Sequence, residues 1–113
     1  MAALLKQFKG VFARVENGAD TEVFAEALRS SFVLAEWSTN NNDVIVDPAR
    51  FAFEGIKVLV HDTPLSLTDR APEAADAVVA ELRRQNFVAN RLPCDTAAQE
   101  NFIRIRIGSR QNQ

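Results

Sequence analysis

The segment from residue 102 to residue 107 constrains the fold more than any other part of the chain. Its three isoleucines alternate strictly with a phenylalanine and two arginines. Successive side chains of a β-strand point to opposite faces of a sheet, so this segment is predicted to be a strand with one buried and one open face. The open face would carry Phe102, Arg104 and Arg106.

A second strand is predicted over residues 51–62, with one irregularity. Phe51 and Phe53 occupy odd positions, whereas the later apolar residues occupy even ones, and a regular strand cannot bury both sets. A β-bulge at Glu54-Gly55 would resolve this conflict, because one extra residue moves every later side chain to the other face. The open face of this strand would then carry Lys57, Leu59 and His61.

Besides the N-terminal segment discussed next, two helices are predicted from apolar side chains that recur every three to four residues. The first begins at Thr21, and its predicted buried face comprises Val23, Phe24, Ala27, Leu28 and Ser31. The second follows a cap at Thr68-Asp69, with Pro72 in its first turn. It ends at Arg83-Arg84, where the helix dipole favours cations.

Two further segments allow alternative structures. Residues 4–15 have apolar side chains at helical spacing and are predicted to be a helix that stops at Asn17-Gly18, with a β-hairpin turning on that pair as the alternative. Residues 32–37 could extend the helix from Thr21 or form a strand. We expect a hairpin that returns over residues 44–46, because the intervening run of asparagines is typical of a turn.

These elements, with a short strand over residues 87–92, predict a two-layer α+β fold in the order ααββ(β)αββ. A mixed sheet of four or five strands would carry the helices on one face. The 113 residues are expected to form a single domain, residues 1–113. A chain of this length buries enough surface to fold without a metal or a disulfide.

Composition narrows the function classes. The chain is 47% hydrophobic and 25% charged, with a net charge of −2, so it is not a generic binder of nucleic acid or anionic membranes. No apolar stretch approaches the ~20 residues of a membrane span. Lys6 and Lys9 interrupt any apolar export signal, and a single cysteine, Cys94, fits a reducing compartment. We therefore expect a cytoplasmic protein without a membrane association.

The open sheet face is the leading candidate functional surface. Apolar and cationic side chains mix on it, and arginine beside aromatic residues is typical of protein interfaces. Trp37, on the predicted edge hairpin, is a further interface candidate. We therefore expect a non-enzymatic interaction or regulatory module that forms a homodimer through this face, with a heterologous protein as the other partner considered. The interface residues would be Lys57, Leu59, His61, Phe102, Arg104, Arg106 and Trp37.

The same face allows two other interpretations. The arginines could be solvated or paired with carboxylates on neighbouring strands, which is their usual structural role on an open sheet. Alternatively the face could bind an anion or nucleic acid through Lys57, Arg104, Arg106 and Arg110. Nucleic acid is the less favoured partner, because the chain has neither a glycine-aromatic strand motif nor a GxxG loop.

A catalytic function is the remaining alternative. His61 is the only histidine and could act as a base oriented by Asp62 or paired with the thiol of Cys94. No glycine-rich turn surrounds Cys94, so structural roles for these residues are expected instead. One histidine and one cysteine cannot form a tetrahedral metal site, and the four glycines lie too far apart for a phosphate loop. No metal or cofactor is therefore expected.

Overall fold

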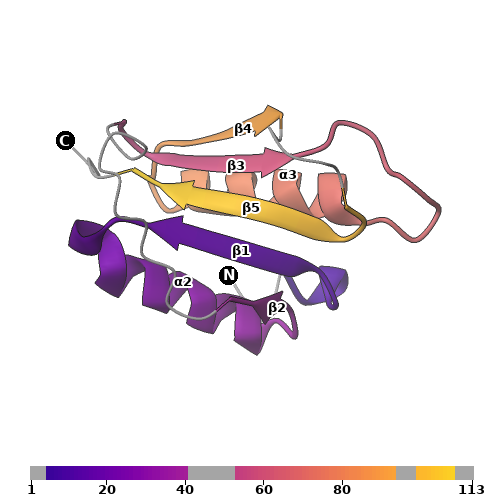
Figure 1. Cartoon of the computed structure of the whole chain (residues 1–113), viewed down its shortest axis with the longest axis horizontal. Coiled ribbons are helices and arrows are strands. Elements are labelled where there is room, and N and C mark those ends of the chain that lie inside the picture. Colours follow the sequence, from indigo (N-terminus) through magenta and orange to yellow (C-terminus); the bar gives the residue numbers. More distant parts are fainter. Residues whose placement is uncertain (1–4, 41–52, 94–98, 109–113) are drawn as a thin grey trace.

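The computed structural model describes residues 5–40, 53–93 and 99–108. The strands among them form one five-stranded mixed sheet (Figure 1). The strands lie in the order β2-β1-β5-β3-β4. Three of them run in one direction: β1 (Phe12–Asn17), β2 (Ser38–Thr39) and β5 (Phe102–Ile107). The other two, β3 (Ile56–Val60) and β4 (Ala89–Pro93), run the opposite way. The predicted mixed sheet is confirmed.

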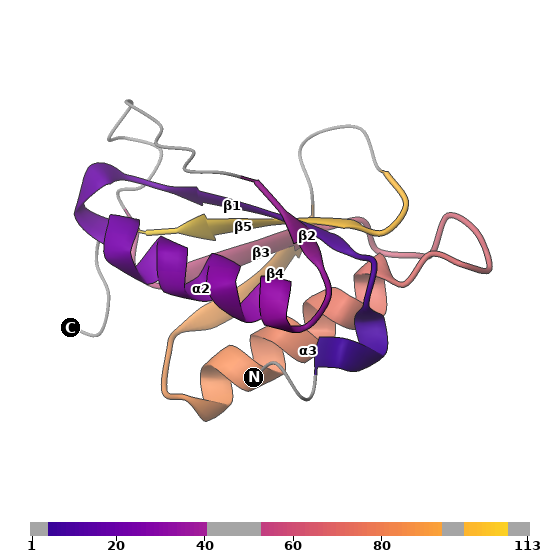
Figure 2. The same ribbon diagram turned by 90° about the horizontal axis from the view of Figure 1, so that it is seen from below.

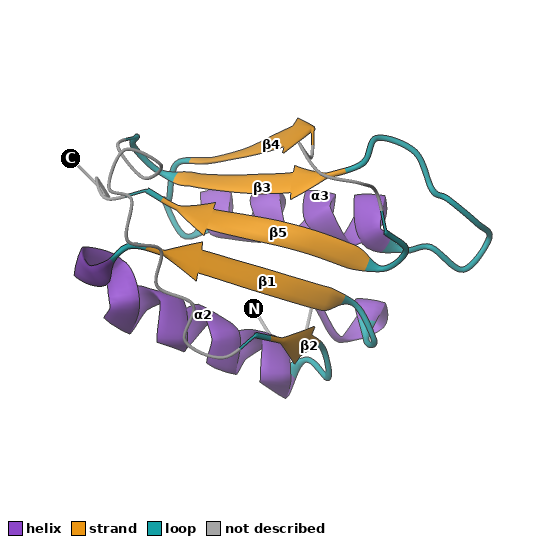
Figure 3. Ribbon diagram, in the orientation of Figure 1, coloured by secondary structure: helices purple, strands orange, loops and turns teal. Residues whose placement is uncertain are grey.

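Two helices cover one face of this sheet, and no described residue forms a helix on the other face (Figures 1, 2 and 3). They are α2 (Glu22–Leu34) and α3 (Ala71–Arg84), and short 3-10 turns lie at Lys6–Phe8 and Ala19–Thr21. α3 has Pro72 in its first turn and two arginines in its last, as predicted. The protein is thus a two-layer α+β domain. No helix among the described residues has the length and apolar character needed to span a bilayer.

The core lies between the sheet and the helices. Ile103, Ile105 and Ile107 of β5 have no exposed surface, so the alternation that predicted this strand also predicted its buried face. β3 contributes its even-numbered residues to the same core, as the predicted bulge requires. Gly55, at the position of that bulge, has a φ of +88° and directly precedes the strand. Residues 51–52 lie outside the described residues.

The helix predicted over residues 4–15 is wrong. Only a 3-10 turn forms near its start, and β1 begins at Phe12. Gly10 has a φ of +92°, which ends any helix at this point. β1 pairs with β5 along its whole length, a long-range contact that outweighs local helical spacing. The alternative hairpin does not form either, because the chain passes from Asn17 through a 3-10 turn into α2.

The hairpin expected over residues 32–46 is also corrected. α2 continues to Leu34, and its last turn is closed by Glu36, which has a φ of +65°. The returning segment at 44–46 lies outside the described residues. Trp37 is a core residue rather than a surface one: its indole Nε1 donates a hydrogen bond to the Leu5 carbonyl at 2.9 Å, and its ring stacks on Phe32. It is therefore not an exposed interface residue.

Candidate functional site: a basic cluster on the open sheet face

The strand register brings the predicted open-face residues together. Lys57 of β3 lies opposite Arg106 of β5, and Leu59 lies opposite Arg104. Paired residues on neighbouring strands share a face, so these side chains point away from the helices. Phe102 has the same orientation, two residues before Arg104. His61 lies just beyond the end of β3 and turns toward a different partner, described below.

β1 adds residues to this face that the sequence analysis missed. Phe12, Arg14 and Glu16 lie beside Phe102, Arg104 and Arg106, respectively, in the register of β1 with β5. The two strands therefore present the same pattern, an aromatic residue, an arginine and a charged residue at every second position. This repeated pattern was the signal available in the sequence. We call the surface formed by Phe12, Arg14, Glu16, Lys57, Leu59, Phe102, Arg104 and Arg106 the basic face.

Three arginines converge on the single carboxylate of the basic face. Glu16 is paired with Arg106 Nε at 3.1 Å, and with Arg104 Nη1 and Arg14 Nε at 3.3 Å each. Its side chain is only 4% exposed. Arg104 Nε is buried and has no acceptor among the described residues. The acid-paired interpretation of the arginines is thus seen, with Arg104 Nε as the donor that these pairs leave unsatisfied within the described residues.

Aromatic rings border the arginine cluster on two sides. Phe12 and Phe102 stack with their centroids 5.5 Å apart and an angle of 11° between the rings. Lys57 Nζ lies 4.0 Å from the centre of the Phe53 ring. A cation above an aromatic face is held by the ring's negative electrostatic potential. Four cations and one carboxylate therefore occupy a surface with ordered aromatic margins, in a chain whose net charge is −2.

Leu59 does not support the interface argument in the way the sequence suggested. An exposed leucine at the centre of an open face would favour a partner that covers it. Leu59 is only 6% exposed, although it is not part of the core beneath the helices. Its burial therefore requires no partner, and the functional case for the basic face depends on charge.

His61 contacts Asp69, not Asp62. His61 Nε2 lies 2.6 Å from Asp69 Oδ2, whereas Asp62 is exposed. Asp69 immediately precedes the N-cap residue of α3, and its carboxylate is fully buried. The thiol of Cys94 and the guanidinium of Arg110 lie outside the described residues, so their contribution to a site is not tested.

The Asp69 carboxylate is a structural hub. Its Oδ1 accepts hydrogen bonds from the backbone N–H groups of Asn101 at 2.8 Å and Ala71 at 3.1 Å, and its Oδ2 accepts one from Leu65 at 2.8 Å. Burial alone would raise the pKa of Asp69, but these donors together with His61 lower it to about 2. A carboxylate saturated in this way holds the β3–α3 loop, α3 and the start of β5 together. We interpret the pair as an anchor.

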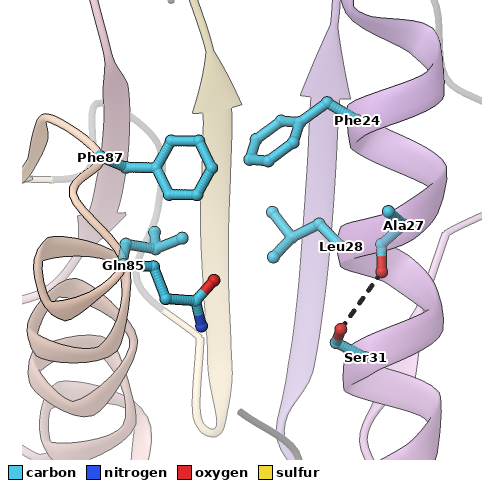
Figure 4. Close-up of a pocket in the computed structure, with 7 residues that line it drawn as sticks. Phe24, Ala27, Leu28, Ser31, Gln85 and Phe87 are labelled. Atoms are coloured by element: carbon cyan, nitrogen blue, oxygen red, sulfur yellow. Dashed lines mark hydrogen bonds between the residues drawn. The ribbon is translucent and has the colours of Figure 1, made fainter. Parts of the chain in front are cut away.

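Neither metal ligands nor the cavity between α2 and α3 offers a further site for chemistry. The described residues contain no cluster of three or more side chains suited to a metal ion. A cavity of about 140 Å³ lies between α2 and α3 (Figure 4). Phe24 and Phe87 face each other across it, with ring centroids 5.0 Å apart. It is smaller than the roughly 300 Å³ at which ligand pockets begin, and its lining carries no ionisable group.

Comparison of the chain with protein-family models, with curated proteins and with solved structures finds no significant match.

Proposed function

We propose that this protein is a non-enzymatic binding module whose basic face recognises an acidic segment of another protein. The observation that carries the proposal is the convergence of three arginines on the single buried carboxylate of Glu16. One carboxylate has fewer lone pairs than three guanidinium groups have N–H donors. Arg104 Nε has no acceptor among the described residues, so the cluster keeps a donor for a second carboxylate.

The chemistry of arginine supports a carboxylate ligand. A guanidinium group is planar, permanently charged and matched to two carboxylate oxygens at once. On an extended peptide, side chains on one side recur about every 7 Å, which is also the repeat of Arg104 and Arg106 along β5. Acidic residues at alternate positions of a bound strand would thus meet successive cations of the basic face.

Charge favours a heterologous partner over a second copy at this surface. Two basic faces brought together would set the cations of one copy against those of the other, and like charges across an interface are costly. The homodimer expected through this face is therefore less favoured than an acidic partner, and it stays a prediction.

Nucleic acid is also less favoured than an acidic peptide. Bases bind to single aromatic platforms. Here Phe12 and Phe102 already stack on each other, and the Glu16 carboxylate lies among the cations that would contact phosphates. The net charge of −2 also opposes long-range attraction of a polyanion.

Binding of a labelled acidic peptide, alternating glutamate and serine over 12 residues, tests the proposal by fluorescence anisotropy. We expect binding at low salt that weakens as salt rises. Arg14→Gln should reduce affinity roughly threefold to tenfold, the effect of one interfacial charge. Arg84→Gln removes the same charge from an exposed residue of α3, on the other side of the sheet, and should change nothing.

The controls decide between partner classes. A neutral peptide with glutamine in place of glutamate should not bind. Tighter binding of a 15-nucleotide oligothymidylate than of the acidic peptide would assign the face to nucleic acid. Absence of binding to either polyanion would leave the arginines with a structural role only.

A further inference from the structure

The basic face is divided along its strands into a charged part and an aromatic end. In β5, Phe102, Arg104 and Arg106 occupy alternate positions, each about 7 Å from the next. In β1, Phe12 and Arg14 lie beside Phe102 and Arg104. Because β1 and β5 are neighbours that run parallel (Figure 1), both phenylalanines lie at the same end of the face and the arginines lie beyond them. We call the pair formed by Phe12 and Phe102 the aromatic end.

The aromatic end is partly open to solvent. Phe12 and Phe102 are both of intermediate exposure, and their rings are nearly parallel at a centroid distance of 5.5 Å. Ser38 of β2 lies beside Phe12 in the strand register, so the neighbour on that side is small. Stacked rings cover one face of each other and leave their remaining surface for further contact. A third apolar side chain can therefore pack on this pair.

The distance from the aromatic end to the charged part matches the repeat of an extended peptide. Side chains on one side of a strand recur about every 7 Å. A ligand residue that contacts the aromatic end is thus two positions from a ligand residue that contacts Arg14 and Arg104. Arg104 Nε is the donor without an acceptor among the described residues, so a carboxylate is favoured at this second position.

An acidic ligand residue is not suited to the aromatic end itself. The faces of aromatic rings carry a negative electrostatic potential, and a carboxylate packed against them would lose its hydration without gaining a donor from either ring. A large apolar side chain would instead remove its own surface and that of the rings from water. Charge alone would let an acidic peptide shift by one repeat along the arginines, whereas an apolar contact at one end fixes its register.

We infer that the acidic segment bound by the basic face carries a large apolar residue at one end, two positions from its nearest acidic residue, and that this residue packs on Phe12 and Phe102. The inference rests on the proposed function of the basic face. It adds the feature by which the protein distinguishes its partner from other acidic segments, since the arginines supply attraction and the ring pair supplies specificity.

Four peptides of identical composition test the spacing by fluorescence anisotropy at low salt. Each has seven residues and blocked termini: two glutamates separated by one serine, one phenylalanine, and serine elsewhere. The phenylalanine lies two positions or one position from the nearer glutamate, on its N-terminal or its C-terminal side. Residues two positions apart share a face of an extended peptide, and adjacent residues do not. At least one peptide with the two-position spacing should bind roughly fivefold more tightly than both peptides with the one-position spacing.

Phe12→Thr tests whether this advantage comes from the ring pair. Threonine suits a strand but removes one of the two rings. The advantage of the two-position spacing should disappear, while affinity for the peptide of alternating glutamate and serine should be unchanged. Phe87→Thr is the matched control, because it removes a ring that pairs with Phe24 on the helix side of the sheet (Figure 4) and should leave the advantage intact. Circular dichroism confirms that each variant is folded at the assay temperature.

The outcomes distinguish this inference from the proposed function. Absence of binding to the peptide of alternating glutamate and serine, or binding that Arg14→Gln does not weaken, would overturn the proposed function. Binding that depends on Arg14 but is equal for the two spacings would overturn the apolar contact alone. An advantage that persists in Phe12→Thr, or that Phe87→Thr removes equally, would also overturn it. If Phe12→Thr does not fold, the comparison of spacings on the parent chain decides.

Discussion

His61 Nε2 lies 2.6 Å from the Oδ2 atom of Asp69, and three backbone amides donate to the same carboxylate. Because the pKa of Asp69 is lowered to about 2, the carboxylate is charged at all ordinary pH values and can only accept. His61 Nε2 must therefore carry the proton of this hydrogen bond. The pair fixes the imidazole orientation and joins the end of β3 to the first turn of α3.

The lowered pKa of Asp69 leads us to expect that the folded protein loses stability in acid. Its pKa in the folded protein, about 2, lies below its usual value of 3.8, so the unfolded chain binds the proton first. The stabilisation is complete above pH 4 and is lost as pH falls toward 2, with a size of roughly 2 kcal/mol. Urea unfolding of Asp69→Asn and of the parent chain should differ by about this amount at pH 5 and converge near pH 2.

Asp62→Asn is the matched control for this measurement. It removes a carboxylate that adjoins His61 in the sequence but is exposed in the structure. Its unfolding free energy should follow the parent chain across the same pH range. Equal acid profiles for Asp62→Asn and Asp69→Asn would contradict the assignment of Asp69 as the partner of His61.

Gly55 is predicted to be intolerant of any side chain. It has a φ of +88°, and a Cβ there would lie 2.5 Å from the carbonyl oxygen of Val88. Gly10 has nearly the same φ, +92°, but open space around it. Gly10→Ala should therefore cost about 1 kcal/mol for the backbone conformation alone, whereas Gly55→Ala should cost at least 1 kcal/mol more. Equal midpoints in urea for the two variants would show that β4 moves away freely.

The sequence predicted the structure correctly wherever a periodic pattern was compatible with only one type of secondary structure and one buried face. The alternation of residues 102–107 fits only a strand with one buried face, and this strand lies at the centre of the sheet. Around Gly55 the apolar residues switch from odd to even positions, which likewise requires an irregularity in the strand backbone. This irregularity placed Lys57 and Leu59 on the correct face of the sheet. Five residues of the basic face were identified from these two patterns.

The remainder of the basic face depended on contacts between distant segments. Phe12, Val15 and their neighbours satisfy helical spacing as well as strand alternation, so local sequence could not decide between them. Pairing of β1 with β5 decided it, and these strands are about 90 residues apart in the chain. With β1 assigned to a helix, Glu16 could not be placed among the arginines.

The buried face of α2 was predicted wrongly for a different reason. Val23 and Ala27, which were expected to be buried, are exposed, and the helix buries a cation instead. Arg29 lies on the buried face, where Arg29 Nη2 donates to the Val15 carbonyl at 2.8 Å and to Asn17 Oδ1 at 3.1 Å. Asn40 also bonds to the backbone N–H and C=O of Val15, in place of a neighbouring strand. A pattern that sorts apolar from charged residues cannot anticipate a charged side chain that completes the edge of a sheet.

Arg29→Met is accordingly predicted to destabilise the protein, although it makes the apolar face of α2 more regular. The change leaves Asn17 Oδ1 without its arginine donor in a buried position, and such groups cost about 1–3 kcal/mol when unpaired. Arg70→Met, on a half-buried arginine whose ion pair with Glu73 is exposed, should cost less than 1 kcal/mol. A gain in unfolding free energy for Arg29→Met would mean that packing outweighs these hydrogen bonds.

Glu16→Gln separates the structural role of the basic face from its proposed binding role. Glutamine keeps the shape of the side chain but removes the negative charge that three arginines share. Removal of one partner from a buried ionic network costs about 3 kcal/mol, and the repulsion that remains is screened by salt. Unfolding in urea, which is uncharged, should show lower stability than the parent chain and a larger recovery between 0.05 and 0.5 M sodium chloride.

The same variant should bind the acidic peptide more tightly than the parent chain at a temperature where both are folded, because Glu16 no longer competes for the arginines. Glu73→Gln, which removes an exposed carboxylate on α3 whose partner Arg70 is also partly exposed, should leave both stability and binding within a few tenths of a kcal/mol of the parent chain. Opposite signs for stability and affinity at Glu16 are the signature of a binding surface. Weaker peptide binding together with lower stability would instead mean that Glu16 orders the arginines for their ligand, and unchanged binding would place the ligand elsewhere.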